Sequence, residues 1–406
     1  MLVLQGLVLM SKPILVVVIA ELFATSLWFS ANSAADSLTK LWSLSSADLG
    51  FLTNSVQLGF IVGTLFFSLS GWADKFSASR IFAICSVLGA IFNACFAILS
   101  YGLISAIIFR FFVGLSLAGI YPLGMKLIVG WDPKTAGKNL GLLVGMLTLG
   151  TALPHGIRWL GADLPWQSVI LSSSFLAILA ALAVAILGDG PHFNSSLKQK
   201  GVPFSNVIHA FRVPEFRSSA LGYFGHMWEL YAFWTIVPLL LISVISTNTF
   251  FTSPALSGLA FLIIGIGALG CILGGVFSQS LGSARVAWFA LLTSGLVCFL
   301  YPFLDQAPTL LKLLILLVWG FAVVADSPQF SAMSAKACPS DLVGTALTIQ
   351  NSIGFLITIL SIWLVTFSFP YIGNKVAWIL LPGPIFGLIF MRSLFRVRQV
   401  KPSIGI

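Results

Sequence analysis

Five ionisable side chains lie deep inside apolar stretches of this sequence: Glu21, Arg110, His226, Glu229 and Asp326. A charge at the centre of a bilayer costs about 2.5–3.5 kcal/mol on insertion scales, so such a residue is a functional candidate by default. Three carboxyls and a histidine suit proton binding, because protonation removes a buried carboxylate charge and histidine titrates near neutral pH. The set predicts binding of a proton or a small solute inside a membrane. The alternative is a set of structural pairs in the protein interior.

Spacing groups several polar residues around these charges. Glu21, Trp28 and Asn32 share one helical face at i, i+7 and i+11, and this face is too polar for lipid. Arg110 shares a face with Tyr121, and Glu21 is a candidate acid partner for Arg110. The predicted substrate- or proton-binding residues are Glu21, Trp28, Asn32, Arg110, Tyr121, His226, Glu229, Asp326 and Gln329.

Aromatic residues accompany the predicted binding residues. They are Phe23, Trp28, Tyr121, Trp228, Tyr231 and Trp234. Rings with a few amides and acids suit a flat or amphipathic organic molecule, a cation included. The alternative is that these rings pack between helices or lie at the membrane interfaces, where Trp and Tyr concentrate.

Metal and cofactor chemistry is not indicated by the remaining side chains. The four histidines are dispersed, and the five cysteines form no CxxC pair. No disulfide framework, metal site or resident cofactor is therefore expected. No Ser-His-Asp grouping or Gly-Lys-Ser/Thr phosphate loop is found either, so the sequence does not indicate an enzyme or the use of ATP.

The composition indicates that membrane-spanning segments must position these residues. Of 406 residues, 58% are hydrophobic and 8% are charged, where a soluble chain carries about 25% charged residues. This excludes a soluble enzyme, a nucleic-acid-binding domain and a disordered chain. Apolar runs of about 20 residues, enough to cross a bilayer, predict twelve spans: 13–36, 48–70, 81–100, 103–127, 137–159, 166–188, 218–245, 255–279, 286–304, 310–335, 342–367 and 374–395.

The charge distribution predicts the orientation. With the N-terminus inside, sixteen Lys and Arg fall on the inner side and four on the outer side, which places both termini in the cytoplasm. Met10 followed by Lys12 and Pro13 is an alternative start, so residues 1–9 are in question. No cleavage site follows the first apolar run, so we expect a retained helix and a bacterial inner membrane.

Two halves of the chain resemble each other. Residues 13–188 and 218–395 each hold six predicted spans, joined by a polar cytoplasmic linker at 189–217. Glu21 recurs as Glu229, and Gly114 recurs as Gly320, at offsets of 208 and 206 residues. Six-span repeats related by an axis along the membrane normal are typical of one large class of transporters.

The chain resembles the major facilitator superfamily over essentially its whole length. In the loop after the second span, Asp74, Lys75 and Arg80 fit the family pattern, while Gly71 is displaced by one position and Ser77 replaces the second glycine. The family's fourth-span pattern appears as Arg110 and Gly114. In the fifth span, Gly141 and Gly150 keep the glycine spacing of drug–proton antiporters. Pro154-His155 replaces the Gly-Pro step of that subclass, which puts the subclass in doubt.

The resemblance implies a gating role for Gly71, Asp74, Lys75 and Arg80. Asp74 would sit against the positive N-terminus of the eleventh span, near Leu342, and would latch one state of the carrier. The alternative is that these residues only anchor their loop among the lipid headgroups.

Together these observations predict an all-α bundle of twelve transmembrane helices in two six-helix halves. We expect a monomeric secondary active transporter that moves a small organic solute by alternating access, with the proton favoured over sodium as coupling ion. An uncoupled facilitator and a non-transporting receptor or assembly factor on the same scaffold remain open. The expected partners are the solute and the lipid bilayer, with no nucleic acid.

Overall fold

The structure, a computed structural model, describes residues 11–192, 207–245, 253–339 and 342–396, apart from a few side chains such as that of Asp74. Within these ranges every regular element is a helix. The question of residues 1–9 lies outside the described residues.

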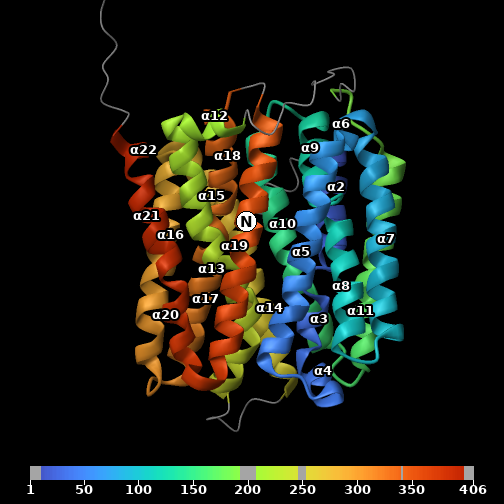
Figure 1. The fold of residues 1–406 in the computed structure, drawn as a ribbon, viewed down its shortest axis with the longest axis vertical. Coiled ribbons are helices and arrows are strands. Elements are labelled where there is room, and N and C mark those ends of the chain that lie inside the picture. Colours follow the sequence, from blue (N-terminus) through green and yellow to red (C-terminus); the bar gives the residue numbers. More distant parts are fainter. Residues whose placement is uncertain (1–10, 193–206, 246–252, 340–341, 397–406) are drawn as a thin grey trace, which may run out of the picture.

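The first group of helices forms one side of the bundle, drawn from blue to green in Figure 1. Its elements are α2 (Lys12–Thr25), α3 (Ser30–Ser33), α4 (Ala35–Trp42), α5 (Ser46–Ser70), α6 (Trp72–Lys75), α7 (Ala78–Leu99), α8 (Leu103–Leu117), α9 (Tyr121–Trp131), α10 (Ala136–Leu160) and α11 (Trp166–Leu187).

The second group forms the other side, drawn from yellow-green to red. Its elements are α12 (Val207–Arg212), α13 (Pro214–Ile245), α14 (Ser253–Gly265), α15 (Gly267–Leu281), α16 (Ser283–Leu300), η2 (Tyr301–Leu304), α17 (Thr309–Ala325), α18 (Ser327–Ala337), α19 (Val343–Ile372), η3 (Gly373–Val376), α20 (Ala377–Leu380), α21 (Pro382–Met391) and α22 (Ser393–Arg396).

Ten helical stretches of the described chain are long and apolar enough to cross a membrane. The last of them, Val343–Phe395, has 53 residues and would extend about 80 Å at 1.5 Å per residue, more than twice the hydrocarbon thickness. The chain turns at Gly373, whose φ of 54° favours glycine, so this stretch holds two spans. The first span is divided into α2 and α3. The predicted all-α membrane fold is confirmed, and these segments accommodate its twelve spans.

The two faces of the bundle are distinguished by the chain ends. Helix α2 begins and α22 ends at the same end of the bundle, where α6 and α12 also lie (Figure 1). We name this end the termini end. Helix α4 lies at the other end, which we name the opposite end. Successive spans alternate in direction between these ends.

Glycines at repeated positions bring helices together within each group. A Cβ on Gly114 would lie 2.0 Å from the backbone oxygen of Val56, so α8 and α5 meet backbone to backbone. A Cβ on Gly320 would lie 1.8 Å from the backbone oxygen of Ile263, where α17 meets α14. The same close approach therefore occurs at the positions that the sequence offset pairs.

The predicted linker at 189–217 contains structure at both ends. Asp189 Oδ1 accepts the backbone N–H of Ser79 at 2.8 Å, and the N–H of His192 donates to Gly130 at 3.0 Å. Helix α12 follows within the predicted linker, and α13 begins at Pro214, four residues earlier than expected. Residues 193–206 lie outside the described part of the chain.

Candidate functional site

A cavity of about 30 Å³ lies between the two groups of helices, with room for one or two water molecules. We name it the central cavity. Helices α9, α10, α13, α17, α18 and α19 contribute its walls: Tyr121, Val144, Leu147, Tyr223, Met227, Leu230, Tyr231, Trp234, Val324, Ser327, Ser331, Asn351 and Phe355. A solute larger than water can enter only if the groups move apart.

Aromatic rings close the central cavity toward the opposite end. Trp28 lies 5.6 Å from Tyr231 and 5.7 Å from Phe355 between ring centroids, and Phe29 meets Trp234 edge to face at 6.0 Å. These five residues form the aromatic layer. It joins the turn after α2 to α13 and α19, so it connects the two groups.

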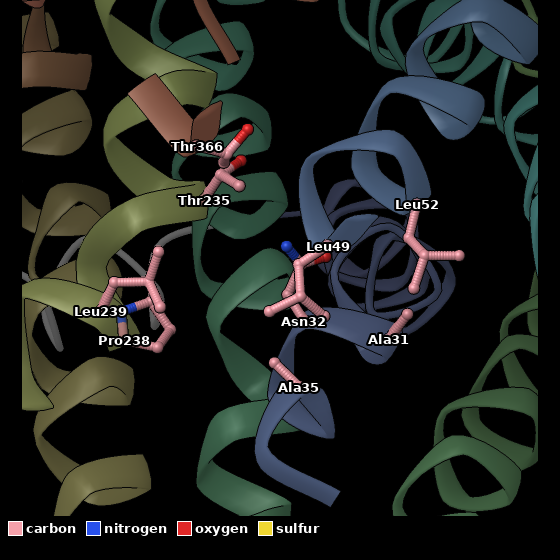
Figure 2. A pocket seen from close by; sticks show the side chains of 9 residues that line it. All are labelled: Ala31, Asn32, Ala35, Leu49, Leu52, Thr235, Pro238, Leu239 and Thr366. Atoms are coloured by element: carbon pink, nitrogen blue, oxygen red, sulfur yellow. The ribbon is translucent and has the colours of Figure 1, made fainter. Parts of the chain in front are cut away.

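A second pocket, of about 20 Å³, lies toward the opposite end. Figure 2 shows the side chains that line it. It is lined by Ala31, Asn32, Ala35, Leu49, Leu52, Thr235, Pro238, Leu239 and Thr366. Helices α5 and α19 join beside it, because Ser46 Oγ donates to the Thr366 oxygen at 2.9 Å and Asn54 Nδ2 donates to the Ile359 oxygen at 3.0 Å. The two groups are thus held together by hydrogen bonds toward the opposite end.

Glu21 is fully buried on α2, and neither carboxyl oxygen has a hydrogen-bond partner. The carboxyl fits against Gly124, where a Cβ would lie 2.4 Å from Glu21 Oε2 and would also contact Leu143. Tyr121, one turn before Gly124, lines the central cavity and is close enough to interact electrostatically with Glu21. A carboxyl without donors therefore lies against α9, one turn from a residue of the cavity wall.

Glu229 has a different environment, although it occupies the corresponding position in the repeat. Its carboxyl accepts hydrogen bonds from Trp319 Nε1 at 2.6 Å, Ser294 Oγ at 2.9 Å and Cys298 Sγ at 3.2 Å. These donors belong to α16 and α17, and Glu229 is absent from the residues that line the central cavity. Glu21 and Glu229 are both predicted binding residues, and neither is among the side chains that line the central cavity. Glu229 instead joins α13 to its neighbours within the second group.

His226 and Asp326 form a buried pair. His226 Nδ1 lies 2.8 Å from Asp326 Oδ1, and each side chain is 1% exposed. Asp326 stands at the break between α17 and α18, and Pro328 is the second residue of the new helix. Gln329 is buried near Gly274 and does not line the central cavity.

Arg110 binds backbone oxygens rather than an acid. Its Nη1 donates to the Leu27 oxygen at 3.0 Å, to Ser30 Oγ at 3.1 Å and to Asn93 Oδ1 at 2.9 Å, while Nη2 donates to the Trp28 oxygen. The proposed partnership with Glu21 is therefore wrong. Arg110 supplies donors to the carbonyls that the turn between α2 and α3 leaves free.

The structure describes the side chains of some of the predicted gating residues. Gly71 has φ of 66° and ends α5, while Lys75 Nζ donates to the Ser70 oxygen at 3.3 Å. Arg80 is exposed in the first turn of α7. The side chain of Asp74 and residues 340–341 lie outside the described residues, so the latch against α19 stays a prediction.

Of the nine predicted binding residues, the structure places Tyr121 in the wall of the central cavity, Trp28 in the aromatic layer and Asn32 in the second pocket. Sequence reasoning missed Tyr223, Met227, Ser327, Ser331 and Asn351. The spacing of Tyr223, Met227, Leu230 and Trp234 marks one face of α13. The prediction for α13 was based on its buried ionisable residue Glu229, which lies on another face of this helix. Trp228, also proposed, points away and donates to the Ile379 oxygen.

Within the described ranges, no three His, Cys, Asp or Glu side chains gather in a way that could hold a metal ion. The cavity walls offer rings, hydroxyls and one amide.

Comparison with known sequences gives one family and a distant pair of relatives. The family model described as Major Facilitator Superfamily matches residues 15–362. Two Escherichia coli proteins, from strains K12 and O157:H7 and both described as an uncharacterized transporter YgaY, are 28% identical over 183 residues. The match covers 43% of this chain and 44% of each relative, so the shared stretch is less than half of either protein.

Comparison with solved structures shows a shared fold. A D-xylose–proton symporter aligns with a TM-score of 0.75 at 16% identity, over 94% of this chain and 96% of that one. The xylose transporter XylE of E. coli, in a partially occluded inward-open conformation, gives 0.73 at 15% identity over 97% and 98%. The human organic anion transporter MFSD10 gives 0.69 at 15% identity over 94% and 100%.

Proposed function

This chain belongs to the major facilitator superfamily, and we propose that it moves a small organic solute across a membrane by alternating access, with the proton as coupling ion. Residues 13–188 and 218–395 are the two moving halves of this mechanism. The central cavity between them is the place where the solute is held.

The unpartnered carboxyl of Glu21 carries the proposal of proton coupling. A buried carboxylate without donors is costly, whereas the protonated form removes the charge. This carboxyl lies against Gly124 of α9, one turn from Tyr121 in the cavity wall, so movement of α2 against α9 would change its access to water. Protonation would thereby be linked to the movement of the halves.

The aromatic layer and the α5–α19 hydrogen bonds support alternating access. They join the halves toward the opposite end, while the polar walls of the central cavity, Ser331 and Asn351 among them, lie nearer the termini end. We place the termini in the cytoplasm of a bacterial inner membrane on the sixteen-to-four distribution of Lys and Arg. In this orientation the described state is closed toward the outside.

The test uses purified protein in liposomes that contain a pH-sensitive dye. A library of organic solutes is added to wild type, to Glu21→Gln and to the matched control Asp163→Asn, which removes an exposed carboxyl in the loop after α10. We expect one class of solute to move protons in wild type and in the control, and no proton movement in Glu21→Gln.

Three other outcomes would overturn parts of the proposal. Solute entry without a pH change in wild type would favour a facilitator. Solute binding without flux would favour a receptor. Proton movement that survives Glu21→Gln would remove Glu21 from the coupling, and the His226–Asp326 pair would be examined next.

A further inference from the structure

We propose that the central cavity selects an organic cation that carries an aromatic or similarly flat apolar group. This inference rests on the proposed transport function and assigns the substrate class of the same cavity. It follows from the kinds of side chain that line the cavity and from the charges closest to it.

Ring faces dominate the cavity wall. Tyr121, Tyr223, Tyr231, Trp234 and Phe355 all line it, and they come from α9, α13 and α19. The three tyrosines therefore surround one small volume of about 30 Å³. The face of an aromatic ring carries partial negative charge and attracts an ammonium group, most strongly where water is excluded.

The charges nearest to the cavity are carboxyl groups. Glu21 lies against Gly124 of α9, one turn from Tyr121 in the cavity wall, and no donor engages its carboxyl. His226 and Asp326 are buried and lie 2.8 Å apart, so each already faces the other. A cation in the cavity would favour the ionised form of Glu21, and release of the carboxyl proton would leave a negative group that no other residue engages.

Basic groups do not reach the same place in the described chain. The residues that line the cavity include no Lys or Arg. The guanidinium of Arg110 is bound to oxygens at the turn after α2, and Lys126 donates to the Ala73 oxygen at the termini end. A carboxylate or phosphate solute would therefore lose its water without gaining a counter-charge, which is costly. The cavity disfavours organic anions.

Neutral polyols are the competing class. Three phenol groups, Ser327, Ser331 and Asn351 could bind hydroxyls, but Val144, Leu147, Met227, Leu230 and Val324 fill the rest of the wall with apolar surface. A polyol would leave several hydroxyls against these side chains without partners. The walls therefore fit a flat apolar group with one positive end better than a ring covered with hydroxyls.

The test measures binding, independently of transport, on the full-length protein in lipid nanodiscs. The probes are benzyltrimethylammonium, phenylacetate and benzyl alcohol, which share a ring and differ in charge, with tetramethylammonium as the control without a ring. We expect benzyltrimethylammonium to raise the melting temperature and the other three to leave it unchanged at equal ionic strength. We also expect Glu21→Gln to weaken binding of this cation at least tenfold.

Two variants separate ring from hydroxyl. Tyr223→Phe keeps the ring face and should bind benzyltrimethylammonium within about twofold of wild type, whereas Tyr223→Leu should weaken binding at least fivefold. The melting temperature without probe shows whether each variant is folded. If Tyr223→Leu is unfolded, Tyr121→Phe and Tyr121→Leu make the same comparison.

The outcomes for the two proposals are distinguishable. Preferential binding of phenylacetate or benzyl alcohol, or the same melting temperature with all four probes, would overturn the assignment of a cationic substrate. Neither result would bear on the proposed transport function. Binding of the cation that depends on Glu21 and the ring, but no proton movement in liposomes, would support the assignment and overturn the proposed coupling.

Discussion

At the scale of single residues, Glu229 is a structural acceptor and Glu21 is not. Glu229→Ala removes the acceptor of the Trp319 indole N–H, and a buried donor left unpaired costs about 1–3 kcal/mol, whereas Ser294 keeps the Leu291 oxygen as an acceptor. We expect Glu229→Ala to lower the melting temperature of the purified protein by several degrees, and Glu21→Gln to leave it near wild type. Equal melting temperatures for the two variants would contradict the assigned roles.

Arg110 gives a second prediction at this scale. Its planar fork reaches the Leu27 and Trp28 oxygens together with Asn93, and a lysine has one ammonium that cannot match this geometry. We expect Arg110→Lys to lower the yield of folded protein and the melting temperature, although the positive charge is kept. Wild-type stability of Arg110→Lys would show that charge alone is needed. The control is Arg158→Lys, whose side chain is partly exposed and 3.7 Å from Asp36.

These residues also show what the sequence could predict of the site. The depth of Glu21, Arg110 and Glu229 follows from their positions in apolar runs, and their burial is confirmed. Their partners were not predictable, because Arg110 binds backbone oxygens, which every residue possesses. Glu229 has hydrogen-bond donors and Glu21 has none. This difference depends on donors that lie 65 and 90 residues farther along the chain than Glu229.

At the scale of elements, glycine positions determine how closely helices pack. Gly114→Ala would place a methyl group against the Val56 backbone, and such overpacking costs about 1–3 kcal/mol. We expect lower expression of folded protein for Gly114→Ala and for its repeat counterpart Gly320→Ala. The control is Gly275→Ala, which has open space around the new methyl group. The three variants are compared by size-exclusion chromatography and by melting temperature. Equal elution profiles and equal melting temperatures would show that these backbone contacts do not matter for stability.

The apolar runs predicted the spans well, because a bilayer imposes length and composition together. They did not predict the break between α2 and α3, because residues 26–29 are as compatible with a helix as their neighbours. Nor did they predict α12, which lies in a polar stretch. The orientation of α13 was also missed, since charges mark one face of this helix while the cavity lies against the face of Tyr223 and Met227.

At the scale of the whole molecule, the contact between α5 and α19 must open if the halves alternate. A Cβ on Gly50 would lie 3.0 Å from Cβ of Thr366, close to the range that a disulfide needs. We expect the double variant Gly50→Cys and Thr366→Cys to lose transport under oxidising conditions and to regain it after reduction.

The single variants Gly50→Cys and Thr366→Cys serve as controls for this experiment. Within the described residues the native cysteines form no disulfide, and four of the five are buried, so background cross-linking should be low. Continued transport by a fully cross-linked protein would exclude opening at the α5–α19 contact.

The partners of Arg110 and Glu229 have a consequence for the order of synthesis. A chain enters the membrane from its N-terminus, so the oxygens of Leu27 and Trp28 are already in place when Arg110 arrives. Glu229 arrives before its donors Ser294 and Trp319 have been made. The first half can thus satisfy Arg110 during biogenesis, whereas Glu229 lacks its indole donor until α17 has been inserted. Truncation of the nascent chain between α13 and α16 would leave that acid exposed to the quality-control machinery of the membrane.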